Sequence, residues 1–321
     1  MTTQVLENVK GHVIKQTRMQ PRAASRLERA MLTHNRFVHA EAQSDGQIST
    51  RLADRVLTLH EELRKARNQL ASYSEALVAI QRSILPQQLP SVPGLDLAVH
   101  FADAEGVGGD FYDVHPIGPD RWAILIADVA GHGLAAAAIL ALVHALGSAV
   151  QDEVAATSPG TALSLVNQQL ATRYLANTSQ FVTVFAGLYS AQSQVLTYAS
   201  AGHPPQRLVR ENEIRRLDAA SGLPLGINET SEYDEASVRL RPGDRLVLFT
   251  DGITESVSPV HDFFGDERLD AVLRAPASTA TELVDRVVNS VGTFRAGRPA
   301  EDDETCLVAV VTPVQQNAQV P

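Results

Sequence analysis

Apolar residues recur alternately four and three positions apart through most of residues 49–86. This spacing averages 3.5 residues and is typical of a helix that pairs with another helix in a coiled coil. No proline or glycine interrupts it before Leu85-Pro86, so the sequence predicts a coiled-coil linker helix over 49–86 that forms a homodimer. One long helix packed on its own domain is the alternative. The seam consists of Leu52, Val56, Leu59, Leu63, Ala66, Leu70, Tyr73, Leu77, Ile80 and Ile84.

The segments on either side of this helix have weaker patterns. Residues 23–40 carry apolar side chains at helical spacing, and a Ser-Asp-Gly break follows them. We therefore predict an N-terminal helical regulatory region over 1–48. After the linker helix, prolines keep the chain extended and mark the start of a large domain over 87–314. Residues 315–321 are expected to form a disordered tail.

From residue 87 onward, apolar runs of strand length outnumber helical patterns. Strands mostly follow strands, which favours an α+β fold with antiparallel sheets flanked by helices over a βαβ fold. The predicted strands are Leu95–Phe101, Trp122–Ala127, Phe181–Tyr189, Val195–Ala199, Arg207–Val209, Ser237–Leu240, Arg245–Phe249 and Cys306–Val311. The predicted helices are Leu134–Val150, Thr161–Leu175, Arg268–Leu273 and Ala280–Val291. The first helix is too short and too rich in alanine to span a membrane, so we predict that it is buried between layers.

Charge is distributed unevenly along the 321 residues. The first 90 residues hold 13 Lys and Arg against 8 Asp and Glu, a net charge of +5, whereas the remainder carries −15. An acidic domain argues against nucleic acid as its ligand. The basic N-terminal part is read as a solvated helical surface, with an acidic partner as the alternative. The single cysteine, Cys306, excludes a disulfide framework and predicts a buried thiol in a reducing, cytoplasmic compartment. The N-terminus also lacks the apolar core of a signal peptide.

Acidic residues stand at the ends of several predicted strands. They are carried by Gly108-Gly109-Asp110, Asp128-Val129-Ala130-Gly131-His132-Gly133, Thr250-Asp251-Gly252 and Glu301-Asp302-Asp303-Glu304-Thr305. Glycines let a backbone approach an ion or a phosphate closely. Carboxylates that gather in space repel one another unless a positive charge lies between them. Oxygen ligands alone favour a hard divalent ion, Mg²⁺ or Mn²⁺, over zinc.

These motifs, in this order, resemble those of the PPM family of metal-dependent protein serine/threonine phosphatases, and most closely its bacterial RsbU/SpoIIE-type branch. The resemblance covers about residues 80–312. It rests on the Asp110 and Asp128 blocks together with Arg82-Ser83-Ile84-Leu85-Pro86, Phe181-Val182-Thr183, Ala201-Gly202-His203-Pro204-Pro205, Gly222-Leu223-Pro224-Leu225-Gly226, Pro242-Gly243-Asp244, Thr250-Asp251-Gly252-Ile253-Thr254-Glu255, Phe264-Gly265 and Asp302-Asp303.

The resemblance implies an αββα sandwich, in which two antiparallel sheets lie face to face with helices outside. It also implies that two Mn²⁺ or Mg²⁺ ions are held by the side chains of Asp110, Asp128, Asp251 and Asp302 and by the backbone carbonyl of Val129. A helix cap or turn is the alternative role for each carboxylate. Asp113 is expected to support this set from outside or to be structural, and Asp303 occupies the place where related phosphatases often have Asn.

Two-metal chemistry needs no nucleophile from the enzyme, because a water activated between the ions attacks phosphorus in line. No cysteine-based phosphate loop surrounds Cys306, which argues against a cysteine phosphatase. The segment 101–107 lacks the arginine with which eukaryotic members grip phosphate. His132 and His203 are expected to have structural roles, with a general-acid role for His132 as the alternative.

The resemblance further implies a phosphorylated STAS-domain anti-sigma-factor antagonist as substrate, in bacterial stress or developmental signalling. A regulatory protein is expected to bind the N-terminal region and to reorder the metal site through the paired helices. The alternative is a non-catalytic dimeric scaffold that binds a STAS-domain or phosphorylated partner.

Overall fold

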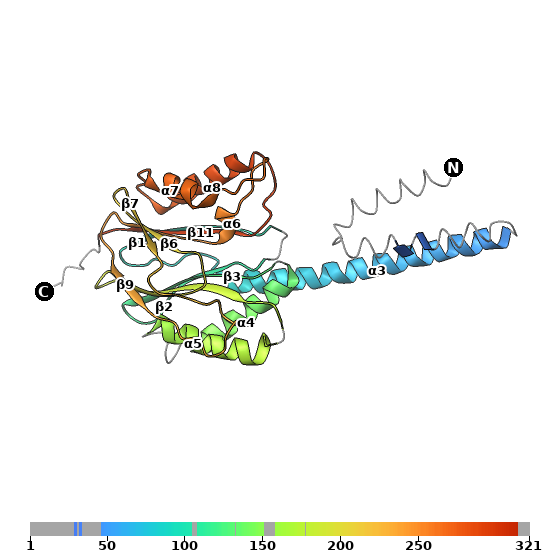
Figure 1. The fold of residues 1–321 in the computed structure, drawn as a ribbon, viewed down its shortest axis with the longest axis horizontal. Helices are drawn as coiled ribbons and strands as arrows, with labels where there is room; N and C mark the ends of the chain where they lie inside the picture. Colours follow the sequence, from blue (N-terminus) through green and yellow to red (C-terminus); the bar gives the residue numbers. More distant parts are fainter. Residues whose placement is uncertain are drawn as a thin grey trace. The chain divides into compact units, whose positions relative to one another are not determined.

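The computed structural model describes residues 29–30, 32–33, 46–104, 108–131, 133–150, 158–176 and 178–313. Most of the predicted N-terminal region and the 315–321 tail lie outside these residues. The chain divides into two units, Met1–Ala71 and Ser72–Pro321. The boundary falls inside helix α3 (Gly46–Ile84), which spans 39 residues (Figure 1).

Helix α3 contains the predicted heptad seam, and the predicted helix is confirmed. Several of its seam residues are exposed, Val56 by 51%, Leu59 by 48%, Leu63 by 41% and Tyr73 by 58%, whereas Ile84 at the end of the helix packs against the domain core. Such exposed apolar side chains are available to a second helix, and pairing of α3 with a second copy stays a prediction.

Two sheets form the centre of the Ser72–Pro321 unit. The first has the strand order β1-β11-β10-β6-β7, and the second has the order β2-β3-β4-β5-β8, with β9 also paired to β5. All named pairings are antiparallel except β5 with β8, which is parallel. The strands are β1 Leu95–Ala102, β2 Phe111–Pro116, β3 Arg121–Val129, β4 Val182–Ser190, β5 Val195–Ala201, β6 Gln206–Arg210, β7 Glu213–Leu217, β8 Ser221–Gly222, β9 Ala236–Arg239, β10 Arg245–Phe249 and β11 Glu304–Val311.

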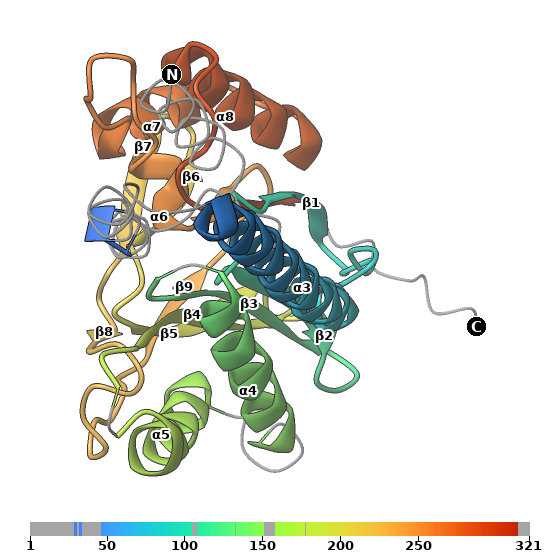
Figure 2. The same ribbon diagram turned by 90° about the vertical axis from the view of Figure 1, so that its right-hand side faces the viewer.

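Helices cover the outer face of each sheet, as Figures 1 and 2 show. The helices α4 (Leu134–Val150) and α5 (Pro159–Gln169), the latter extended by the π-helical turn η2 (Leu170–Tyr174), pack on the β2–β5 sheet. The helices α7 (Gly265–Arg274) and α8 (Ala280–Arg295) pack on the other sheet, and a short helix α6 (Asp251–Thr254) follows β10. The predicted αββα sandwich is confirmed.

Side-chain burial follows this layering. One cluster, with Ile124, Ile126 and Leu248, fills the space between the sheets. A second lies under α4 and α5, and a third lies under α7 and α8. Cys306 belongs to the third cluster and is fully buried in β11, as expected. Among the described residues, no helix is long and apolar enough to cross a membrane.

Candidate metal centre

The four predicted carboxylates come from both sheets. Asp110 directly precedes β2 and Asp128 lies near the end of β3, whereas Asp251 begins α6 after β10 and Asp302 lies just before β11. The strands β2 and β3 are neighbours in one sheet, and β10 and β11 are neighbours in the other. Facing sheets therefore bring together residues that are up to about 190 positions apart in the sequence.

Asp110 is the most deeply buried of these carboxylates, with 1% of its surface exposed. Its Oδ2 atom accepts hydrogen bonds from the hydroxyls of Thr250, at 2.7 Å, and Thr305, at 2.6 Å. Burial, followed by repulsion from Asp128, raises the pKa of Asp110 well above its usual range. Two hydroxyls from one sheet thus fix a carboxylate that belongs to the other.

Asp128 stands among other acids. Burial and then the charges of Asp251 and Asp302 raise its pKa to about 8. The pKa of Asp251 is also raised, by burial and by Glu255. Each charged group that perturbs Asp128 is a carboxylate. The ionised form of the Asp128 carboxylate is therefore disfavoured at this end of the sandwich, and a bound cation is favoured.

Asp303 fixes the glycine turn that carries Asp110. Its carboxylate accepts hydrogen bonds from the backbone N–H groups of Ala104, at 2.9 Å, and Gly109, at 2.7 Å. A methyl group on Gly108 would collide with this carboxylate, and one on Gly109 would lie 2.7 Å from the carbonyl oxygen of Val129. Asp303 therefore supports the turn before Asp110 through its side chain. Val129 places its carbonyl against the same turn.

His203 connects the two sheets beside this centre. It lies between β5 and β6, is 2% exposed, and places Nδ1 2.8 Å from the Thr183 hydroxyl and Nε2 3.2 Å from the carbonyl oxygen of Phe249. Burial lowers the pKa of His203 to about 3, so the ring is neutral. A structural role agrees with this geometry. His132 lies outside the described residues.

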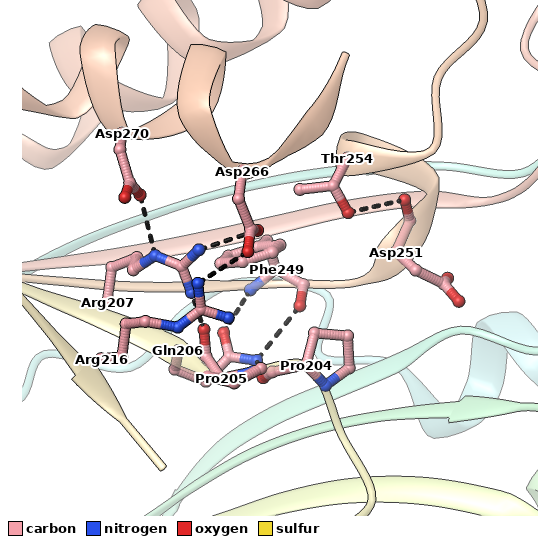
Figure 3. A network of polar contacts seen from close by, with 10 residues as sticks. All are labelled: Pro204, Pro205, Gln206, Arg207, Arg216, Phe249, Asp251, Thr254, Asp266 and Asp270. Carbon is pink, nitrogen blue, oxygen red and sulfur yellow. Dashed lines mark hydrogen bonds and ion pairs between the residues drawn. The ribbon is translucent and has the colours of Figure 1, made fainter. Parts of the chain in front are cut away.

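Figure 3 shows a polar network around the buried Arg207 that was not predicted from the sequence. The fully buried Arg207 pairs with Asp266 and Asp270, both at 2.8 Å, and lies over the ring of Phe249. The side chain of Gln206 binds both backbone groups of Phe249. Because Phe249 is two residues before Asp251, this network fixes the strand end that carries the candidate ligand. The available signal was an arginine at the start of the apolar run in β6.

Asp113 is placed elsewhere. Its carboxylate pairs with His115 at 2.6 Å on the outer face of β2, and it does not join the four predicted ligands.

The donor set suits a hard divalent ion, because carboxylate and carbonyl oxygens are the groups such ions prefer. In the part of the chain that the structure describes, no three histidine, cysteine, aspartate or glutamate side chains stand close enough to enclose an ion as they are placed. The carboxylates are nevertheless near enough to raise one another's pKa. An ion would relieve this repulsion by drawing the side chains together.

The αββα sandwich and the acidic residues at the ends of its strands together define a protein of the PPM, or PP2C, class. A sequence profile of the SpoIIE family, Stage II sporulation protein E, matches residues 118–312. This is more than half of the chain, and the chain belongs to that family, in the RsbU/SpoIIE-type branch of the PPM phosphatases.

Individual relatives agree with this assignment. The phosphoserine phosphatase RsbU of Bacillus subtilis is 30% identical over 197 residues, which make up 61% of this chain and 57% of RsbU. The chain spans about half the length of the curated relatives that it matches.

Solved structures share the fold. The SiaA-PP2C domain of Pseudomonas aeruginosa superposes with a TM-score of 0.67 at 24% identity, over 76% of this chain and 97% of that domain. The catalytic domain of the serine/threonine protein phosphatase PstP, solved in complex with 2 manganese ions, gives a TM-score of 0.50 at 20% identity, over 68% of this chain and 99% of that domain.

Proposed function

We propose that this chain is a metal-dependent protein serine/threonine phosphatase. The observation that carries the proposal is the meeting of acidic strand ends from both sheets, where Asp110 and Asp128 have pKa values raised by burial and by neighbouring carboxylates. Such a cluster is unfavourable without bound cations. Family membership supports the same activity, since RsbU is a phosphoserine phosphatase.

The proposed ligands are the carboxylates of Asp110, Asp128, Asp251 and Asp302 and the carbonyl oxygen of Val129. We expect two Mn²⁺ or Mg²⁺ ions, as the 2 manganese ions of PstP and the magnesium of RsbX support. When bound, such ions supply positive charge and Lewis acidity for the attack of water on a phosphate ester.

The protein's own residues hold the ligands in place. Thr250 and Thr305 orient the Asp110 carboxylate, and Asp303 holds the turn before it. Preorganised groups of this kind need little rearrangement when charge develops in the transition state. Cys306 is no candidate nucleophile, because its thiol is buried and its pKa is raised to about 12.

As substrate we propose a phosphoserine or phosphothreonine on a STAS-domain anti-sigma-factor antagonist, in bacterial stress or developmental signalling in the cytoplasm. The support comes from the RsbU and RsbP relatives, both phosphoserine phosphatases by name.

Regulation is proposed to pass through helix α3 as a homodimeric coiled coil, with a regulatory protein at the N-terminal region. One contact supports this route: the backbone N–H of Gly108 donates to the side-chain oxygen of Gln81, at 3.2 Å, near the end of α3. A change in the last turns of this helix would therefore reach the turn that carries Asp110.

The test is phosphate release from a phosphoserine STAS-domain protein in Mn²⁺, in Mg²⁺ and in EDTA. We expect metal-dependent release that falls by several orders of magnitude in Asp128→Ala and Asp251→Ala, because each variant removes a ligand. The exposed Asp234→Ala is the matched control and should keep the wild-type rate. If Asp128→Ala and Asp251→Ala keep their biological function and no phosphate release is measurable in any metal, the protein is a non-catalytic scaffold.

A further inference from the structure

A cavity of about 560 Å³ lies between the outer face of the β2–β4 strands and the helices α4 and α5. Figure 1 shows these two helices beneath that sheet. Helices that cover a sheet normally fill the space between them with large side chains. Here part of the wall is small, and the small lining residues are Ala123, Ala127, Gly147, Ser148, Ala162, Ala186 and Gly187.

Gly147 shows how the sequence keeps this space open. It lies within α4, where glycine costs about 1 kcal/mol relative to alanine. A methyl group on Gly147 would meet no atom within 4 Å. After proline, glycine is the residue least favourable to a helix. Helix α4 carries it at the position where a side chain would project into vacant space.

One end of the cavity is polar. Asp113 and His115 are paired at 2.6 Å on the outer face of β2. The rings of His144 and Phe111 pack in a T-shaped arrangement, with their centroids 5.6 Å apart. Among the described residues that line the cavity, Asp113 is the only aspartate, glutamate, lysine or arginine. The cavity is thus an apolar chamber with a single carboxylate, which is the composition of small-molecule sites.

The same chamber touches the strands of the candidate metal centre. Phe111 and Ala127 line it, and they are the immediate neighbours of Asp110 and Asp128 in the sequence. Side chains of successive strand residues point to opposite faces, so an occupant on the outer face presses on the backbone that carries both carboxylates.

We propose that this cavity binds a small, mostly apolar molecule with one cationic amine head beside Asp113, and that its occupancy changes phosphate release. The first half concerns binding alone. The second half rests on the proposed phosphatase activity. Asp113 selects the charge of the head, and the alanine-lined chamber accepts an alkyl or aryl body.

The probes are octylamine, octan-1-ol and octanoate, which share one chain and differ in their head. Their binding to the full chain is measured by saturation-transfer NMR and calorimetry. We expect octylamine to bind most tightly and octanoate most weakly, because the carboxylate of Asp113 repels a second one. Asp113→Asn should remove the preference for the amine and leave octan-1-ol binding unchanged. Equal binding of octylamine and octanoate to the wild-type chain would overturn the assignment of the head group.

Two glycine variants test the location. Gly147→Leu fills the chamber and should weaken octylamine binding at least about tenfold, or about 1.4 kcal/mol. Gly292→Leu on α8 is the matched control, because Gly292 is also helical, has no atom within 4 Å of an added methyl group and lies outside the cavity. Unchanged binding to Gly147→Leu would overturn the site.

Phosphate release is then measured with and without octylamine, in the wild-type chain and in Gly147→Leu. We expect octylamine to change the wild-type rate and to leave that of Gly147→Leu unchanged. Binding without any change in the rate of an active enzyme would overturn the regulatory half. Binding to a chain that releases no phosphate in any metal would overturn the proposed function and leave the binding site standing.

Discussion

The Nδ1 atom of His203 lies 2.8 Å from the hydroxyl of Thr183, and this contact links the two halves of the candidate metal centre. The carbonyl oxygen of Phe249 only accepts hydrogen bonds, so Nε2 carries the ring proton and Nδ1 accepts from Thr183. Thr183 pairs with Asp128 across β3 and β4. One neutral imidazole therefore joins β4, which is the neighbour of the strand of Asp128, to β10, which leads to Asp251.

We predict that His203→Ala weakens both stability and metal binding. The variant removes one hydrogen bond from the Thr183 hydroxyl and one from the Phe249 carbonyl oxygen, and it creates a cavity, which together cost about 2–4 kcal/mol. Thermal unfolding should show the lower stability, and a Mn²⁺ titration should show a weaker affinity. His60→Ala on α3 is the control, because His60 is exposed and lies in neither sheet. Loss of stability with unchanged Mn²⁺ affinity would limit His203 to a purely structural role.

The stability of the protein should also depend on the protonation of His203. Its pKa is about 3 when folded and about 6.5 when unfolded. The unfolded chain therefore binds the proton first, and the stabilising contribution of the neutral ring is present above pH 6.5 and is lost as the pH falls towards 3. The measurement is the unfolding free energy of wild type minus that of His203→Gln, against pH. A flat difference between pH 6.5 and 4 would contradict the buried, neutral ring.

The protonation of Asp128 should change stability with pH in the opposite direction to that of His203, and it should also affect metal binding. Without metal the pKa of Asp128 is about 8, well above its unfolded value, so the metal-free fold loses stability as the pH rises from about 4 to 8. An ion binds the ionised carboxylate and must displace the proton. We therefore predict that affinity for Mn²⁺ rises by up to about tenfold per pH unit below pH 8.

Calorimetry in buffers of different ionisation enthalpy measures the protons released on metal binding. Asp128→Asn cannot release this proton, so it should bind metal more weakly and with a flatter dependence on pH. An equal proton release from wild type and Asp128→Asn would show that another group is the source.

Much of the fold could be predicted because apolar runs mark strands that are buried on both faces. The β10 range and that of α4 were predicted correctly, and β11 was predicted to within two residues. Strand β2 was not predicted, because it alternates buried residues with Asp113 and His115. Strand β7 was not predicted either, because it is an edge strand with one buried residue. The helix expected over 161–175 contains a π-turn that sequence periodicity does not reveal.

The acidic residues of the candidate site could be predicted from the sequence, whereas the contacts that hold them in place could not. Its acids stand in short glycine-rich motifs at strand ends, which a sequence displays directly. The roles of His203, Asp303 and Arg207 depend on contacts between loops and strands that are distant in the sequence. The 199 positions between Ala104 and Asp303 show this, since only the folded chain brings that pair to 2.9 Å.

The exposed seam of α3 gives a prediction about assembly. Leu63 is a seam position and is 41% exposed, whereas Leu57 lies off the seam and is 67% exposed. We predict that Leu63→Glu shifts a dimer towards monomer, because a charge at a seam position faces the partner helix. Leu57→Glu should leave the dimer intact. Sedimentation of both variants and of the wild type measures this, and a monomeric wild-type chain would exclude pairing through α3.

Gly108 and Asp303 should prove to be energetically coupled. A methyl group on Gly108 collides with the Asp303 carboxylate, whose oxygens hold Ala104 and Gly109. We predict that Gly108→Ala lowers stability by about 1–3 kcal/mol through overpacking and lowers phosphate release at least about tenfold, or about 1.4 kcal/mol of activation free energy, because the turn carries Asp110.

A double-mutant cycle measures this coupling. Asp303→Ala removes the group with which the methyl collides, so the double variant should be less impaired than the sum of the single variants by about 0.5–3 kcal/mol. Gly292→Ala, where the added methyl meets no atom within 4 Å, should leave phosphate release unchanged. Additive effects of the two substitutions on unfolding would mean that Gly108 is required for a reason other than its approach to Asp303.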